Sequence, residues 1–113
     1  MLPAKARLRR SPDFAETLKR GRRAGRTTLV VSILKGENSS PAPARVGFVV
    51  GRRVGGAVVR NRLRRRLQHL VADRRASLPP GSRTVIRALP GAERLRYADL
   101  GHELDALVAR AGR

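Results

Sequence analysis

Apolar residues recur along this chain with two different periods, and each period predicts a different kind of element. In one segment they return every third or fourth position, as Val59, Leu63, Leu67, Leu70 and Val71. This spacing sets them on one face of a helix over residues 57–75, which packs that face on a core. A similar spacing predicts a final helix over residues 97–110.

Runs rich in β-branched and aliphatic residues predict three strands, over residues 27–34, 45–50 and 83–88. A loop with Gly, Asn, Ser and Pro over residues 35–44 joins the first two, so we expect them to form an antiparallel hairpin. The order of elements predicts an α+β domain with helices stacked on one small sheet.

A short first helix begins at the Ser11-Pro12-Asp13 segment and ends near Gly21. Serine favours a helix N-cap, proline the first turn, and glycine the C-terminal end. Residues 1–10 carry four basic side chains and no acid, so we expect a basic mobile arm ahead of a single domain over residues 11–113.

The charge balance indicates that this small domain binds a polyanion. The chain has 26 Lys and Arg against 8 Asp and Glu, a formal net charge of +18. Only three of the basic residues are Lys; a GC-rich genome explains part of that preference for Arg but not the excess of charge. Nucleic acid is the natural partner of such a surface.

Other compositional features exclude several classes of protein. The absence of cysteine excludes disulfides and thiolate metal sites. The longest apolar runs fall short of the roughly 18 residues that cross a membrane, so we expect a cytoplasmic protein.

The helix over residues 57–75 concentrates the charge, with five Arg between positions 60 and 66. Like charges three and four residues apart repel one another, and an anionic ligand would remove that cost. We expect Arg62 and Arg65 to face outward. Arg60 falls within the apolar arc, so its stem must lie on the sheet and its head in a groove where helix and sheet meet.

Several classes of function fit part of this pattern. A metal-dependent nuclease needs clustered carboxylates, and here the acids are scattered. A structural RNA-binding protein, such as a small ribosomal protein, fits the charge and size equally well. Identifying the RNA that co-purifies with the protein would distinguish a ribosomal protein from a protein that binds another RNA. A DNA-compacting protein lacks the exposed apolar wedge that class uses, and a membrane-active helix would need the apolar arc that the core takes.

The ordered run from Arg45 to Arg65 is specific. It combines a strand, a glycine turn at Gly55-Gly56 and a helix that opens with Arg60-Asn61-Arg62. In this it resembles the bacterial ribonuclease P protein subunit, and the segment Leu8 to Phe14 resembles the family's first helix. The likeness extends from about residue 7 to residue 110.

The resemblance implies a fold and a mechanism. The fold is an approximately four-stranded sheet with three helices and a left-handed βαβ crossover around the arginine-rich helix. A catalytic RNA subunit cleaves precursor tRNA at the 5′ end of the mature sequence, with Mg²⁺ at the RNA and substrate and no cofactor on the protein. The protein binds that RNA and the single-stranded 5′ leader, and neither DNA nor a membrane is an expected partner.

The resemblance also assigns residues to two surfaces. The predicted RNA-binding residues are Arg52, Arg53, Arg60, Asn61, Arg62, Arg64, Arg65 and Arg66. A leader cleft between the arginine-rich helix and the sheet would hold Phe14, Leu18, Ser32, Phe48, Arg60 and Arg64. Leu18 and Ser32 stand where some members carry aromatics, and Gln68 replaces a basic residue. From spacing alone, Phe14 is as much a core residue as a base-stacking platform.

Overall fold

The computed structural model describes residues 2–36 and 42–112. Within these residues, three α-helices and four strands follow one another, with short 3₁₀ turns before the first helix and between some of the later elements. The elements are α1 (Ser11–Arg20), β1 (Arg22–Gly25), β2 (Leu29–Leu34), β3 (Arg45–Val50), α2 (Ala57–Asp73), β4 (Arg83–Ala88) and α3 (Tyr97–Ala111). The strands form one mixed sheet in the order β1-β2-β4-β3.

The last strand of the chain lies in the middle of the sheet. β4 pairs antiparallel with β2 and parallel with β3, with Val31 opposite Ile86 and Phe48 opposite Ile86 on the other side. The predicted hairpin between residues 27–34 and 45–50 is therefore wrong, because β4 separates the two strands. The sequence pattern gave the positions of the strands but not which strand edges pair, and β4 lies in the centre because it pairs along both of its edges.

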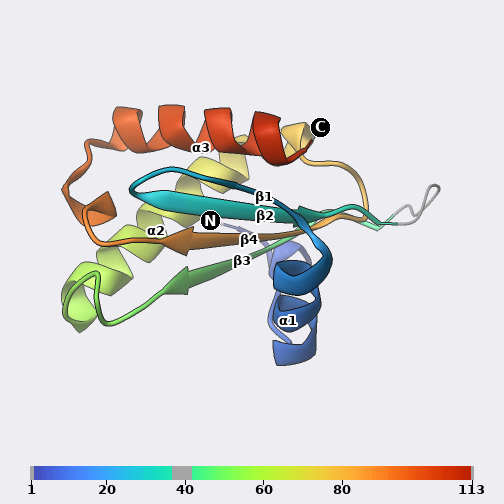
Figure 1. Cartoon of the computed structure of the whole chain (residues 1–113), viewed down its shortest axis with the longest axis horizontal. Coiled ribbons are helices and arrows are strands. Elements are labelled where there is room, and N and C mark those ends of the chain that lie inside the picture. The colour runs from blue at the N-terminus through green and yellow to red at the C-terminus, as the bar shows by residue number, and fades with distance from the viewer. Residues whose placement is uncertain (1, 37–41, 113) are drawn as a thin grey trace.

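The connection from β3 through α2 to β4 is a left-handed crossover, as the family resemblance implied. In Figure 1 the arrows of β3 and β4 both point left, β4 lies above β3, and α2 passes behind the sheet. Parallel crossovers are right-handed in about 98% of cases, so this connection is a distinctive feature of the fold.

The helices cover the sheet unequally. α2 and α3 pack on the face that carries Leu29, Val31 and Ile33 of β2, whereas α1 crosses the opposite face (Figure 1). The main core lies under α2 and α3 and includes Leu63, Leu67, Leu70, Leu100, Leu104 and Leu107, all fully buried. The predicted apolar arc of α2 is thus its core-facing side.

The N-terminal segment does not project as the expected basic arm. Leu2, Ala6 and Leu8 are buried, and the Leu8 N–H donates to the Val46 carbonyl at 2.9 Å. Arg7 forms a parallel bridge with Val46 beside β3. The apolar residues between the basic ones anchor this segment at the β3 edge, where strand backbone groups would otherwise lack partners.

Element boundaries follow the predictions closely, with a few differences. Strands β3 and β4 have the predicted bounds, while α2 ends at Asp73, two residues early, and β2 begins at Leu29. The prediction from strand patterns missed β1, a four-residue strand with two exposed arginines that has too little apolar content to give a signal. It extends the sheet beyond β2.

Candidate nucleic-acid interface

Helix α1 holds an aromatic ring against the sheet. Phe14 lies over Gly47 of β3, where an added Cβ would come within 2.3 Å of the Phe14 Cζ atom. The ring remains partly exposed. Glycine at this position lets the ring contact the strand backbone directly, and any larger residue would push α1 away from the sheet.

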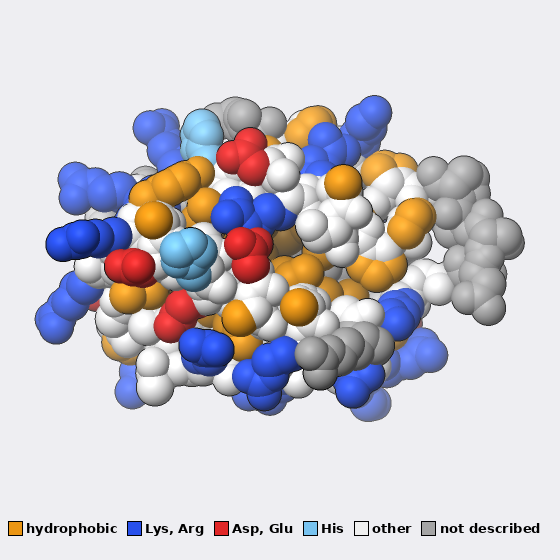
Figure 2. Space-filling view, turned by 90° about the horizontal axis from the view of Figure 1, so that it is seen from above, with side chains coloured by type: hydrophobic (Ala, Val, Ile, Leu, Met, Phe, Trp, Pro, Cys, Tyr) orange, Lys and Arg blue, Asp and Glu red, His pale blue; other side chains and the backbone are white. Residues whose placement is uncertain are grey.

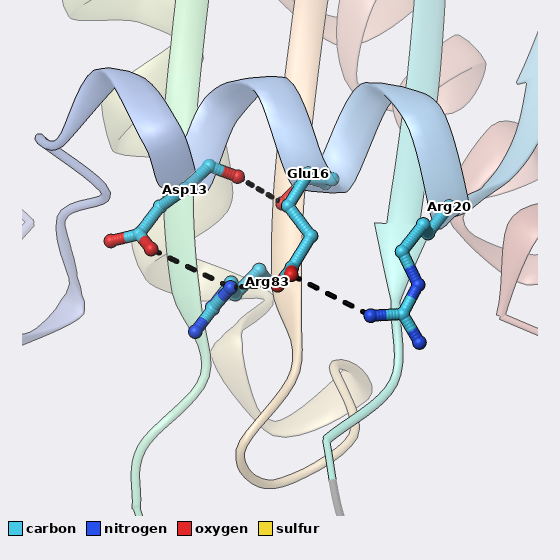
Figure 3. Close-up of polar contacts among 5 residues, drawn as sticks. Asp13, Glu16, Arg20 and Arg83 are labelled. Carbon is cyan, nitrogen blue, oxygen red and sulfur yellow. Dashed lines mark hydrogen bonds and ion pairs between the residues drawn. The ribbon is translucent and has the colours of Figure 1, made fainter.

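A cluster of ionic groups holds the same helix from the other side (Figure 3). Arg83 of β4 reaches Glu16 with a 2.5 Å contact and Asp13 with a 3.5 Å contact. Glu16 also lies 3.5 Å from Arg20. These groups are partly exposed, so each pair is worth at most about 1 kcal/mol. Their effect is to orient α1 and to occupy two of the chain's few acids.

The part of the sheet that α1 leaves uncovered forms a mixed apolar and basic surface. Across β2, β4 and β3, Val30, Arg87 and Val49 lie side by side, Arg87 exposed and the valines half-buried. Leu18 on α1 is 51% exposed. We call this surface, made by Phe14, Leu18, Val30, Val49 and Arg87, the open sheet face.

Two of the predicted cleft residues lie elsewhere than on the open sheet face. Ser32 shares the α1 side of the sheet but is buried. Phe48 points to the opposite side, because it alternates with Gly47 and Val49 along β3, and it packs against the main core.

The predicted groove between α2 and the sheet is not formed. That space is filled by the core-facing leucines of α2, and α1, which carries Phe14, lies on the opposite face of the sheet from α2. The single cleft expected for Phe14, Arg60 and Arg64 is therefore wrong in its geometry. Side-chain alternation in β4, which sets Arg83, Val85 and Arg87 on one face, was the available signal for the open sheet face.

The outer side of α2 carries several of the predicted RNA-binding residues in exposed positions. Asn61, Arg62 and Arg65 are exposed, as predicted for Arg62 and Arg65, and Arg64 is half-buried. The Arg64 Nη1 donates to the Asn61 Oδ1 at 3.3 Å. The pair Arg52 and Arg53 is exposed in the turn between β3 and α2.

Arg60 has an incompletely satisfied side chain. It is half-buried, and its Nε is buried with no hydrogen-bond partner among the described residues. A buried donor without a partner costs about 1–3 kcal/mol. The expectation that Arg60 lies partly within the packed side of α2 is confirmed.

Arg66 makes a hydrogen bond within the protein and is also partly exposed. One of its Nη2 hydrogens is donated to the Leu95 carbonyl, which joins α2 to the segment before α3. The guanidinium has further donors to offer, since arginine carries five N–H groups.

The face over α3 carries charges of both signs. Figure 2 looks onto this face and shows Lys and Arg side chains around its rim, with acidic side chains, a further basic group and an apolar hollow nearer its middle. Asp105 of α3 contacts Arg74 at 2.5 Å, and this hydrogen bond raises the pKa of Arg74. A cavity of about 440 Å³ beside this pair is mainly apolar. Neither feature suits a phosphate backbone.

The described part of the chain lacks two further kinds of feature. Residues 2–36 and 42–112 contain no group of three or more His, Cys, Asp or Glu placed to hold a metal ion. Within the same residues, the helices are too short or too polar to cross a bilayer.

The fold defines a class of small α+β proteins with a left-handed crossover, and solved structures of that class are similar to it. The ribonuclease P protein from Thermotoga maritima, in complex with 1-(4-fluorophenyl)-2-thiourea, superimposes with a TM-score of 0.80 at 26% identity, covering 92% of this chain and 98% of that one. The Staphylococcus aureus protein gives 0.81 at 18% identity, covering 96% and 98%.

Sequence comparison gives the family. The family model of ribonuclease P matches residues 2–112. The ribonuclease P protein component of Streptomyces bikiniensis is 53% identical over 97% of this chain and 94% of its own length, and that of a Nocardioides species is 50% identical over 99% and 96%. The chain belongs to the ribonuclease P protein family, and its role lies in tRNA processing.

Proposed function

We propose that this chain is a non-catalytic subunit that binds two RNAs on two sides of its sheet. The outer side of α2, with the turn at Arg52 and Arg53, docks on the catalytic RNA. The open sheet face holds the single-stranded 5′ leader of precursor tRNA. The holoenzyme then removes that leader by hydrolysis of one phosphodiester bond, and we place it in the cytoplasm with no DNA or membrane partner.

The assignment of the leader to the open sheet face rests on one observation. The part of the sheet that α1 leaves uncovered is an apolar strip with a basic side chain beside it. Single-stranded RNA binds best where bases meet apolar or aromatic groups and phosphates meet arginines. Phe14 and Leu18 supply the first, and Arg87 supplies the second. Double-stranded RNA presents few unstacked bases, so this surface favours a flexible strand.

The docking of α2 rests on charge that the protein alone leaves uncompensated. Arg62 and Arg65 are exposed, and they carry no ion pair with the described acids. Phosphate oxygens accept bidentate hydrogen bonds from guanidinium groups, so binding a structured RNA relieves the repulsion among these arginines.

The placement of the carboxylates supports cleavage by the RNA subunit and not by the protein. Asp13 and Glu16 are engaged with Arg83, and Asp105 with Arg74, on different faces of the molecule. We therefore expect Mg²⁺ to act on the catalytic RNA and the substrate, where it would stabilise the charge of the displaced oxygen. The protein's residues bind and orient the leader, and we expect no cofactor on the chain itself.

The proposal is tested by reconstitution. RNA-free protein should leave precursor tRNA uncut in Mg²⁺, and addition of the catalytic RNA should give one product with the mature 5′ end, mapped by primer extension. At low Mg²⁺, cleavage should depend on the protein. Site-specific cleavage by the protein alone, or no effect of the protein on the RNA's activity, would contradict the proposal.

A further inference from the structure

A groove on the outer side of α2 contains an aromatic residue that the proposed function does not use. Its volume is about 530 Å³, and its lining includes Val58, Arg62, Arg65, Arg66, His69 and Tyr97. Tyr97 is the first residue of α3 and the others belong to α2. We call this feature the Tyr97 groove. It lies on the α2 side of the molecule, away from the open sheet face.

The groove gathers apolar groups that face solvent. Among the described residues, three large apolar side chains are exposed, and Leu18 belongs to the open sheet face. The other two, Val58 at 72% and Tyr97 at 44%, both line the Tyr97 groove. Exposed apolar groups gathered at one place on a charged surface indicate a binding site better than single ones do.

Charge in the groove is of one sign. Among the described residues, its lining contains three arginines and no acid. Glu93 borders a smaller cavity with Arg62 and Arg66, but its carboxylate accepts the Gly91 N–H at 2.6 Å. The occupant is therefore anionic and carries a flat apolar part, which describes a nucleotide: its base stacks on an aromatic ring and its phosphates meet guanidinium groups.

The backbone that carries the Tyr97 ring is held by the fold. Arg66 donates to the Leu95 carbonyl, which holds the segment two residues before Tyr97 against α2. One turn into α3, Leu100 is fully buried and its N–H donates to the Arg96 carbonyl at 2.9 Å. The tyrosine backbone is thus anchored on both sides, so little conformational freedom is lost when a base stacks on the ring.

We propose that the Tyr97 groove binds one unpaired nucleotide of the catalytic RNA, with its base on Tyr97 and its phosphates on Arg62 and Arg65. This inference rests on the proposed docking of α2 on that RNA and adds a stacking contact to it. It predicts that the RNA presents an unpaired base at the site, because a base within a helix has both faces covered.

The first test compares the full-length wild type with Tyr97→Ala and Tyr97→Phe in binding to the catalytic RNA. Stacking on one aromatic side chain accounts for about 5- to 150-fold in affinity, so Tyr97→Ala should weaken binding within that range. Tyr97→Phe keeps the ring and should stay within about twofold of wild type. Thermal unfolding of each variant controls for folding.

The salt dependence of the same titrations separates stacking from charge. Tyr97→Ala should keep the slope of log affinity against log salt, since it removes no positive charge, whereas Arg65→Ala should flatten it by about one unit. A flattened slope in Tyr97→Ala, or an equal loss in Tyr97→Phe, would overturn the stacking contact.

The chain offers a direct reporter, because Tyr97 is its only tyrosine. With ¹³C-labelled tyrosine, one set of ring signals should shift upfield on addition of a short oligouridylate and stay in place with an abasic oligonucleotide of the same length. Equal responses to the two would overturn the proposal. So would wild-type affinity of Tyr97→Ala for the catalytic RNA, which would leave the groove to a protein partner.

Failure of this inference is distinguishable from failure of the proposed function. If the wild type binds the catalytic RNA and restores cleavage while Tyr97→Ala does so equally well, only the stacking contact is lost. If the wild type itself neither binds that RNA nor affects cleavage, the proposed function fails first.

Discussion

The ring of Phe14, on helix α1, rests against the backbone of Gly47, on strand β3. The ring stands where the side chain of any other residue at position 47 would lie. A Cβ at position 47 would lie 2.3 Å from the Phe14 Cζ atom, far inside contact distance. The glycine therefore determines how closely α1 approaches β3 and where the ring stands beside the open sheet face. A change at Gly47 should affect both folding and the proposed leader surface.

Gly47→Ala should destabilise the protein and weaken leader binding together. Overpacking of this kind costs about 1–3 kcal/mol, which denaturant unfolding would measure. The displaced ring should also reduce the preference of the holoenzyme for precursor over mature tRNA. Gly51→Ala is a matched control, because a Cβ there has no atom within 4 Å. Wild-type stability of Gly47→Ala would show that the ring does not rest on the strand.

The contact between Arg83 and Glu16 should stabilise the seating of α1 on the sheet. A double-mutant cycle with Arg83→Gln and Glu16→Gln should give a coupling free energy of about 0.2–1 kcal/mol at low salt, reduced at high salt. The more exposed and longer pair of Glu16 with Arg20 should couple less strongly. A cycle in which Arg20 couples as strongly as Arg83 would contradict this account of α1.

The outward arginines of α2 should act through phosphates. Arg62→Ala and Arg65→Ala should each lower the affinity for the catalytic RNA and flatten its salt slope by roughly one unit. Arg110→Ala removes an exposed arginine from α3 and serves as the control, since that face lies outside the proposed interface. If Arg110→Ala changed the salt slope as much as Arg65→Ala does, binding would depend on the total charge alone.

Replacement of Arg60 should leave the stability of the protein level or raise it, and should lower its affinity for RNA. Arg60→Met keeps the apolar stem and removes the buried Nε that has no partner, so the free energy of unfolding should stay level or rise, by at most about 1–3 kcal/mol. Affinity for RNA should fall, because the charge that would meet a phosphate is gone. Calorimetry and RNA titration on the same preparation measure the two effects, and a variant with lower stability and unchanged affinity would be the contrary result.

Local patterns predicted the elements of this fold better than their pairing. The leucines of α2 gave its core side, and β3 and β4 were placed with their correct bounds. Strand order depends on contacts between distant residues, so the insertion of β4 between β2 and β3 left no local mark and the predicted hairpin was wrong. The left-handed crossover came from the family resemblance alone.

The exposure of the candidate arginines was partly predictable from the sequence, and the arrangement of the candidate surfaces was less so. Repulsion among the arginines pointed to the outer side of α2, and Arg62 and Arg65 lie there as expected. The predicted cleft put Phe14 on the wrong side of the sheet, because the periodicity of α1 does not say which sheet face it covers. The N-terminal segment was also misplaced, since three buried apolar residues were hidden among basic ones.

The most direct test of the two-surface account is the affinity of the holoenzyme for precursor and mature tRNA in wild type and Phe14→Ala. Stacking of one leader base contributes about 1–3 kcal/mol, so Phe14→Ala should weaken binding of precursor tRNA by about that amount. Binding of mature tRNA, which has no leader, should hardly change, and the unfolding of the variant should be followed in parallel. Equal losses for both tRNAs in a folded protein would contradict the assignment of the leader to the open sheet face.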